Sequence, residues 1–135
     1  MTDCLFCDLV AGRIPRFVVL EDADAVAFLT KDPAAIGHTL VVPRRHVEHL
    51  WDGTGDDVAA VARTVHAVAA LLHERLDPDG LTMRQNTGEA SGQRVFHLHI
   101  HLVPRWHGDG HIGWPTRPET MPTPEEVLAR LTGSR

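Results

Sequence analysis

The stretch His97-Leu98-His99-Ile100-His101-Leu102-Val103 places three histidines in strict alternation with aliphatic residues. In a β-strand, residues two apart point to the same face of the sheet. A strand over 95–103 would therefore present three imidazoles on one face and pack Leu98, Ile100 and Leu102 into a core on the other. The pattern predicts one strand that builds both a hydrophobic layer and a titratable surface.

The distance between the first and last histidines of this row limits the chemistry that the three can carry out together. At about 3.3 Å per residue, His97 and His101 lie roughly 13 Å apart along the strand, whereas zinc–nitrogen bonds are about 2 Å long. Two neighbouring histidines could share an ion, but a flat row of three could not. Because imidazole has an unperturbed pKa of about 6.5, the row favours proton transfer and nucleophilic chemistry. The alternative is a partly exposed strand that is merely rich in histidine.

Around this stretch the chain predicts further short strands and two helices. From Asp56 to Leu76, apolar residues recur every three or four positions, Thr54 is a suitable N-cap, and Pro78 and Gly80 follow. Strands are expected over 18–20, 25–29, 38–42, 81–85 and 95–103, and a terminal helix over 124–131. These elements predict an α+β fold: an antiparallel sheet with one long helix inserted.

Length and composition exclude several classes of protein. With 135 residues and 43% hydrophobic content, the chain is long enough to bury the core of one domain. Its net charge of −5 argues against a nucleic-acid or anionic-membrane partner. It has no apolar run long enough to span a bilayer and no signal-peptide pattern, so a cytoplasmic location is expected.

Cys4-Leu5-Phe6-Cys7 supplies half of a possible zinc site. A closed tetrahedral site needs two more ligands, and the chain has no second pair of this kind, so these would be histidines. The candidates are His38, His46, His49 and His97. Two buried free cysteines, or a redox pair, are the alternatives, although no thioredoxin-like pattern accompanies the cysteines.

The segment from Asn86 to Gln93 lies just before the histidine row and contains two glycines with several amide and hydroxyl groups. Backbone N–H groups in such turns can form an anion-binding concavity. The alternative is a hairpin turn that needs glycine only for its backbone conformation. Neither common glycine-rich phosphate-binding motif is present. A Trp114-Pro115 pair further along could cap a pocket, although tryptophan more often only packs.

Taken together, these motifs closely resemble the histidine triad family of nucleotide-binding hydrolases and transferases. The resemblance extends over nearly the whole chain, and the N-terminal segment is similar to that of the bacterial, Hint-like members. The matching segments are Cys4–Cys7, Gly12–Pro15, Gly37–His46, Gly92-Gln93, His97–Val103 and Pro104-Arg105. The resemblance implies a single HIT domain over 1–135, with a five-stranded antiparallel sheet, one long helix and a C-terminal helix.

The resemblance also implies a role for each matching residue. His99 would be the nucleophile, His101 would contact the leaving group and the phosphate, and His38 would lie beside them. With His99 and His101, the residues expected to bind the nucleotide are Asn86, Gly92, Gln93 and Arg94. A structural zinc ion would be held by Cys4, Cys7, His46 and His97. Family members form homodimers in which two sheets join, with the long helix and the fifth strand expected near the interface.

Two positions depart from the family pattern. Many members carry an acidic residue just after the second strand, where it binds the ribose hydroxyls; here the position is Thr30, and Asp32 is out of register by two. Relatives often carry Ser or Thr at the position of Arg94, where it touches the leaving group. A cation there could favour an anionic leaving group, such as a polyphosphate, over an amine.

The sequence therefore predicts a small homodimeric enzyme that hydrolyses a nucleoside phosphoramidate, or a related nucleotidyl compound, at the α-phosphate. His99 would form a nucleotidyl intermediate, and a neighbouring imidazolium would protonate the leaving group. Within the same family, a dinucleoside polyphosphate hydrolase or a nucleotidyl transferase is the alternative. From other classes, a nucleotide-binding module with weak turnover and a zinc-binding scaffold remain open.

Overall fold

The computed structural model describes residues 4–110, 113–115 and 117–133. Two single-turn 3-10 helices, η1 and η2, accompany the regular elements. In chain order the elements are α1 (Leu5–Val10), β1 (Val18–Glu21), β2 (Ala25–Leu29), β3 (Thr39–Pro43), η1 (Leu50–Asp52), α2 (Gly55–Leu76), β4 (Gly80–Arg84), η2 (Glu89–Ser91), β5 (Ile100–Arg105) and α3 (Pro124–Thr132).

The five strands form one sheet in the order β1-β2-β3-β5-β4, and every neighbouring pair is antiparallel. The predicted α+β class, with one long helix and a C-terminal helix, is confirmed. Because β5 lies between β3 and β4, His101 lies in the interior of the sheet and not at its edge.

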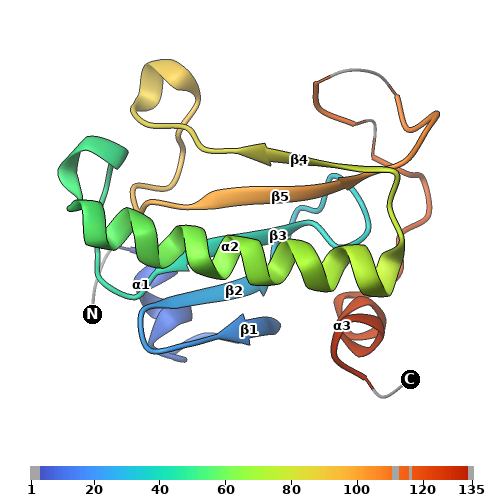
Figure 1. The fold of residues 1–135 in the computed structure, drawn as a ribbon, viewed down its shortest axis with the longest axis horizontal. Helices are drawn as coiled ribbons and strands as arrows, with labels where there is room; N and C mark the ends of the chain where they lie inside the picture. The colour runs from blue at the N-terminus through green and yellow to red at the C-terminus, as the bar shows by residue number, and fades with distance from the viewer. Residues whose placement is uncertain (1–3, 111–112, 116, 134–135) are drawn as a thin grey trace.

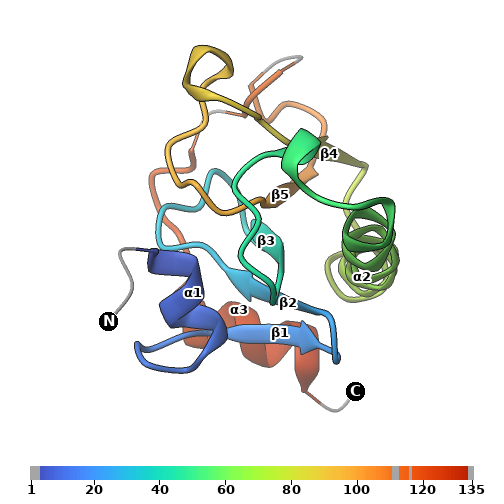
Figure 2. The same cartoon turned by 90° about the vertical axis from the view of Figure 1, so that its left-hand side faces the viewer.

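Helices cover the two faces of the sheet (Figures 1 and 2). Strand residues alternate between these faces, as the pleat requires. Val41 and Leu102 pack with α2 and α3 in one core, whereas Val26 and Leu40 pack with α1 in the other. His101 lies directly opposite Leu40 in the β3–β5 ladder, so its side chain belongs to the α1 face.

The long helix α2 follows the sequence pattern closely. Thr54 accepts a hydrogen bond from the Asp57 backbone N–H, and the Asp57 carboxylate accepts one from the Thr54 N–H, which forms a capping box. The helix begins one residue earlier than expected and ends at Leu76, after which Asp77 adopts a left-handed conformation with φ 49°. Its apolar stripe is buried against the sheet. No helix in the described part of the chain is both long and apolar enough to cross a bilayer.

The expected strand over 95–103 is wrong in its first half, because β5 begins only at Ile100. Residue pairing with β3 stops at Val41–Ile100. Beyond it, the Leu98 N–H donates to the carbonyl of Val47, and the carbonyl of Pro43 accepts a hydrogen bond from the His97 ring. Proline has no N–H to continue a ladder, so side-chain and loop hydrogen bonds replace strand pairing here.

Candidate functional site

The three histidines share one side of the chain although only His101 lies within the regular strand. The rings of His99 and His101 are 5.1 Å apart between centroids, and Phe6 of α1 makes edge contacts with His97 and His99. Leu98 and Leu102, in the gaps, are buried. The predicted alternation of imidazoles and core residues is therefore present. Phe6 thus lies against His97, at the end of the row near the cysteines, and against His99, which with His101 forms the reactive end of the row.

His99 is held in one orientation by a backbone hydrogen bond. Its Nδ1 lies 2.8 Å from the carbonyl oxygen of His97, which can only accept, so the proton is assigned to Nδ1. This leaves Nε2 with a lone pair. Burial lowers the pKa of His99 below its ordinary value. A neutral, oriented imidazole with one unprotonated nitrogen is the state that nucleophilic attack requires.

His38 and His101 form the second part of the reactive end. The Ala34 N–H donates to Nδ1 of His38, and Nε2 of His38 lies 3.0 Å from Nδ1 of His101. Burial and the neighbouring His101 lower the pKa of His38 to about 3, and burial, His99 and Arg84 lower that of His101 to about 4. Both rings are neutral near pH 7 in the free protein, so the imidazolium expected beside His99 is not present before substrate binds.

Two residues that the sequence did not assign to the site border its reactive end. The Trp114 ring makes edge contacts with His38 and His101, at centroid distances of 5.5 Å and 5.6 Å. The guanidinium of Arg84 lies over the same ring, 4.1 Å from its centroid. The possibility that Trp114 caps a pocket was noted from the sequence, but Arg84 carried no recognisable signal, because only the strand order brings it to His101.

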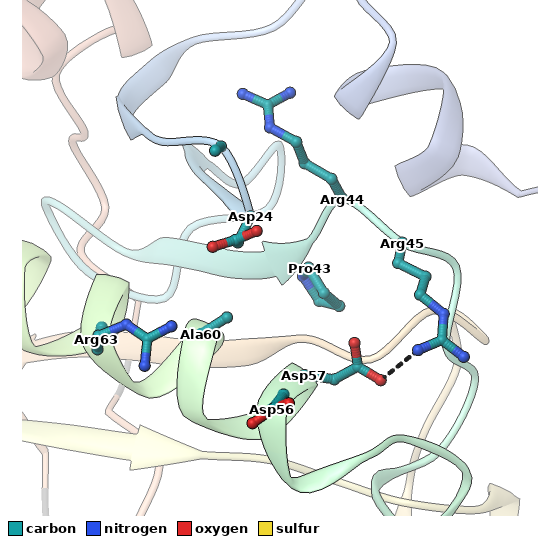
Figure 3. Close-up of a pocket in the computed structure, with 9 residues that line it drawn as sticks. Asp24, Pro43, Arg44, Arg45, Asp56, Asp57, Ala60 and Arg63 are labelled. Carbon is teal, nitrogen blue, oxygen red and sulfur yellow. Dashed lines mark hydrogen bonds and ion pairs between the residues drawn. The ribbon is translucent and has the colours of Figure 1, made fainter.

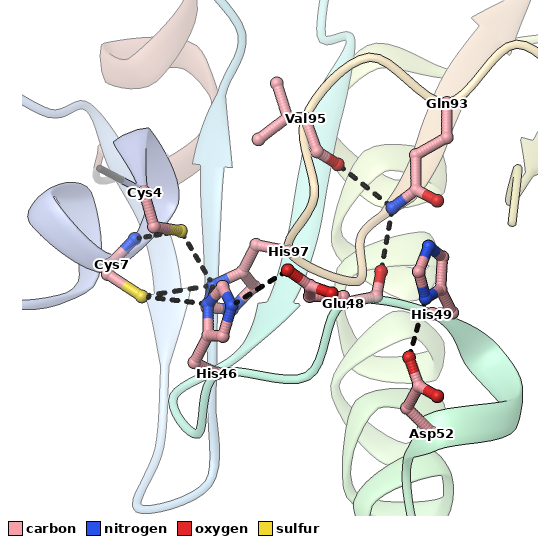
Figure 4. A network of polar contacts seen from close by, with 9 residues as sticks. All are labelled: Cys4, Cys7, His46, Glu48, His49, Asp52, Gln93, Val95 and His97. Carbon is pink, nitrogen blue, oxygen red and sulfur yellow. Dashed lines mark hydrogen bonds and ion pairs between the residues drawn. The ribbon is translucent and has the colours of Figure 1, made fainter. Parts of the chain in front are cut away.

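Two cysteines and two histidines converge at the other end of the row (Figure 4). His97 Nδ1 lies 3.3 Å from Cys4 Sγ, 3.4 Å from Cys7 Sγ and 3.3 Å from His46 Nδ1, and Cys7 Sγ lies 3.2 Å from His46 Nδ1. Tetrahedral zinc, with bonds of about 2.0–2.3 Å, would place neighbouring donors roughly 3.3–3.8 Å apart. The donor set therefore fits one four-coordinate metal ion.

The protonation of this group also fits a cation. The Nε2 of His97 lies 2.7 Å from the Pro43 carbonyl oxygen, so the proton sits there and Nδ1 turns a lone pair toward the sulfurs. Burial and the adjacent Cys4 raise the pKa of Cys7 to about 11. A cation would be needed to hold the Cys7 sulfur as a thiolate near neutral pH.

The geometry also decides among the four histidines that the sequence left open as ligands. His46 and His97 belong to the group, whereas His38 bonds to His101. Nδ1 of His49 lies 2.6 Å from Oδ2 of Asp52 (Figure 4). The His49 ring also contacts Trp51. The pair predicted as zinc ligands is thus the pair that the fold brings to the cysteines.

The turn between β4 and β5 is held together by its own polar groups. Buried Gln93 donates to the carbonyls of Glu48 and Val95 and accepts from the Gly88 N–H. The backbone N–H groups of Gly92 and Gln93 bond to carbonyls within the turn, and the Asn86 amide donates to Ser91 O. Gly88 and Gly92 both have positive φ. The Gln93 side chain thus stabilises the turn by hydrogen bonds. The backbone N–H groups of Gly92 and Gln93 are already hydrogen-bonded within the turn.

Two hollows lie outside the reactive end. Arg94 lines one of about 650 Å³ beside the cysteine–histidine group, with Cys7, His46 and Phe96. A second, of about 350 Å³, lies between the end of β3 and the first turns of α2, where Arg45 and Asp57 form a 2.8 Å ion pair (Figure 3). Thr30 lies near His38, with its N–H donating to the His38 carbonyl.

Comparisons with known proteins agree with this geometry. The model of the HIT domain matches residues 11–108. The protein hit of Bacillus subtilis is 38% identical over 98% of this chain and 96% of its own. An adenosine 5′-monophosphoramidase of Schizosaccharomyces pombe is 33% identical over 93% of this chain and 91% of its own. A zinc-bound histidine triad family protein of Mycobacterium smegmatis superimposes with a TM-score of 0.85 at 35% identity, covering 96% of this chain and 90% of that one.

Proposed function

This chain belongs to the histidine triad family, and on that premise we propose that it hydrolyses a nucleotidyl compound at the α-phosphate through His99. A nucleoside phosphoramidate is the leading substrate class, supported by the name of the Schizosaccharomyces pombe relative. The observation that carries the proposal is the hydrogen bond from His99 Nδ1 to the His97 carbonyl, which leaves Nε2 as a lone-pair nucleophile.

The reaction follows in two balanced steps. Nε2 of His99 attacks the α-phosphorus, a phosphorus–nitrogen bond forms, and the bond to the leaving group breaks with its electron pair. An amine leaving group must take up a proton. The negative charge of a bound phosphate raises the pKa of His101, so that the ring takes up a second proton as substrate binds and, as an imidazolium, gives its Nε2–H to the amine. Water then attacks phosphorus, its proton goes to His101, and His99 is released.

The remaining nucleotide contacts are part of the proposal. Continuing the pairing of Arg84 with His101 would bring Asn86 level with His99, which supports a phosphate-binding role for the Asn86 side chain. Gly92 and Gln93 would act by shaping the turn, because their donors are engaged within it. Arg94 would add positive charge from its side of the turn.

Covalent trapping tests the proposal. Protein incubated with adenosine 5′-phosphoramidate and quenched in acid should carry an adenylyl group on the peptide that contains His99, as measured by mass spectrometry. His99→Ala should lose both the adduct and turnover, whereas His66→Ala, at an exposed position of α2, should keep both. Tight nucleotide binding with neither adduct nor turnover would instead favour the nucleotide-binding module.

We also propose that Cys4, Cys7, His46 and His97 hold a structural zinc ion, supported by the fit of their donor atoms and by the zinc-bound relative. When bound, zinc would supply a crosslink with all four positions taken by protein. It would tie α1 and the segment after β3 to the start of the histidine row. The reactive Nε2 of His99 would stay outside this group.

A homodimer and a cytoplasmic location complete the proposal. Among the residues that the structure describes, strand β4 pairs only with β5, and it exposes 63% of Met83 and 40% of Leu81, so a second sheet would join at this edge. Strand β5, which the resemblance places near the interface, is the next strand inward from this edge of the sheet. In analytical ultracentrifugation the native protein should sediment as a dimer and Met83→Lys as a monomer. Cysteines that hold zinc as thiolates, as proposed for Cys4 and Cys7, are typical of a reducing compartment.

A further inference from the structure

Arg84 is the last residue of β4 and lies directly opposite His101 in the β4–β5 ladder. Directly opposed residues of an antiparallel pair have Cβ atoms about 5 Å apart and point to the same face. His101 is thus flanked on one side by His38, from the segment before β3, and on the other by a permanently charged guanidinium.

The guanidinium of Arg84 is held in place but not neutralised. It lies 4.1 Å from the centroid of the Trp114 ring, and that ring also contacts His38 and His101. Among residues 4–110, 113–115 and 117–133, no carboxylate forms an ion pair with Arg84. Stacking fixes the plane of the guanidinium and leaves its N–H groups free for an anion, which Arg binds through two parallel hydrogen bonds.

Building on the proposed function, we infer that Arg84 is a specificity-determining residue that binds negative charge on the leaving group. Arg84 would then raise the turnover of nucleotides whose α-phosphate carries a second phosphate or a sulfate relative to the turnover of phosphoramidates. Arg94, the cation considered for this role from the sequence, lines the hollow beside the cysteine–histidine group instead.

The two kinds of leaving group also differ in whether they need a proton, and this difference favours the anionic leaving group beside Arg84. An amine must be protonated as it leaves, and burial, His99 and the Arg84 charge all lower the pKa of His101, the ring that could supply the proton. A phosphate or sulfate departs as an anion: the bond from phosphorus to the bridging oxygen breaks, the oxygen keeps the electron pair, and no proton is needed. Charge then develops beside Arg84, where a fixed cation stabilises it.

A pair of substrates that differ only in the leaving group tests the inference. The ratio of kcat/KM for adenosine 5′-phosphosulfate to kcat/KM for adenosine 5′-phosphoramidate should fall about 10- to 100-fold in Arg84→Gln, the effect of losing hydrogen bonds between charged groups. Arg84→Lys, which keeps the charge but not the planar stack, should fall in between. Arg130→Gln, an exposed arginine on α3, is the matched control and should keep the native ratio.

An equal loss with both substrates would assign Arg84 to holding Trp114 and would overturn the inference, as would an unchanged ratio. Because Arg84 is exposed on an edge strand, its variants should melt within a few degrees of the native protein.

A binding measurement separates this inference from the proposed function. In calorimetry the native protein should bind ADP more tightly than AMP, and Arg84→Gln should lose that preference, whether or not either compound is hydrolysed. If the native protein hydrolyses neither substrate, the proposed function fails and the ADP-to-AMP preference still decides the role of Arg84. If it binds neither AMP nor ADP, both fail.

Discussion

Nε2 of His38 lies 3.0 Å from Nδ1 of His101, and this contact links the segment before β3 to the reactive strand β5. Because the Ala34 N–H donates to Nδ1 of His38, the His38 proton must be on Nε2, from which it is donated to His101. The proton of neutral His101 is therefore left on its own Nε2. The fold thus selects a tautomer for each ring, and a protein N–H fixes the first of them.

This pair should make the protein acid-sensitive. The folded pKa of His38 is lowered to about 3, below the unfolded value of 6.5, so the unfolded state binds more protons between these values. The stabilisation is complete above pH 6.5 and is lost as the pH falls toward 3. Below about pH 6 the fall in the free energy of unfolding should approach about 1.4 kcal/mol per pH unit for this group alone, with roughly half of that between pH 7 and pH 6. Denaturant titrations at pH 7, 6 and 5 measure it.

The contribution of His38 can be isolated by substitution. His38→Gln should be less stable than the native protein at pH 7 and should show a shallower decline in stability toward pH 5, because one titrating group has been removed. His66→Gln replaces an exposed histidine of α2 and should reproduce the native decline. A decline as steep in His38→Gln as in the native protein would contradict the assignment.

Gly37, next to His38, should not tolerate a side chain. Its φ is +83°, and a Cβ would come within 2.5 Å of Leu76 Cδ1 and 3.3 Å of Leu72 Cδ2. Strain and overpacking together predict that Gly37→Ala lowers the free energy of unfolding by about 2–4 kcal/mol. Gly55→Ala, at the start of α2 with no atom within 4 Å of the added Cβ, should be neutral or stabilising by up to about 1 kcal/mol. Urea denaturation of the two variants gives the comparison.

Much of the fold could be predicted because its signals are local. The stripe of α2, its cap at Thr54 and strand β2 (Ala25–Leu29) appear in the structure with bounds within one residue of those expected. The start of β5 could not be found this way. It depends on where pairing with β3 ends, which is decided by Pro43 and by a side-chain hydrogen bond from His97 that no periodicity reports. The short helix α1 was missed because six residues carry no helical period.

In the candidate site, too, the features with a local sequence signal could be predicted, and those that depend on other elements could not. The histidine row and the Cys4–Cys7 pair are visible as spacing along the chain, but their partners come from other elements. Only the strand order β3-β5-β4 brings Arg84 beside His101. Likewise, the residue types alone leave His46 and His49 as equal candidates for a metal ligand, although the family resemblance favours His46. The path of the chain after β3 brings only His46 of the two to the cysteines.

That separation gives a prediction about zinc. His46→Ala should weaken zinc binding by about 100-fold or more, since it removes a ligand from a four-donor set. His49→Ala, three residues on and hydrogen-bonded to Asp52, should bind zinc as the native protein does. Competition against a chromophoric chelator measures both affinities. Equal weakening of zinc binding in the two variants would contradict the ligand assignment. In a separate measurement, a chelator should lower the melting temperature of the native protein more than that of His46→Ala.

Gln93 should be required as an amide and not merely as a side chain of its size. It is only 3% exposed, and its NH₂ group donates to two carbonyl oxygens, those of Glu48 and Val95. In Gln93→Glu, a carboxylate oxygen would face both carbonyls with no proton to share. Because each buried group left unsatisfied costs about 1–3 kcal/mol, the variant should lose roughly 2–6 kcal/mol of unfolding free energy at pH 7.5.

The pH dependence of this variant distinguishes lost hydrogen bonds from lost packing. Burial and the facing carbonyls raise the folded pKa of the new carboxyl above its unfolded value of about 4.3. Protonation restores one donor, so the stability deficit of Gln93→Glu relative to the native protein should shrink as the pH falls through that raised pKa. Gln93→Met, which fills similar space without donors at any pH, should show a constant deficit. Denaturant titrations at pH 7.5 and 5.5 decide between the two, and a constant deficit in Gln93→Glu would assign the loss to packing.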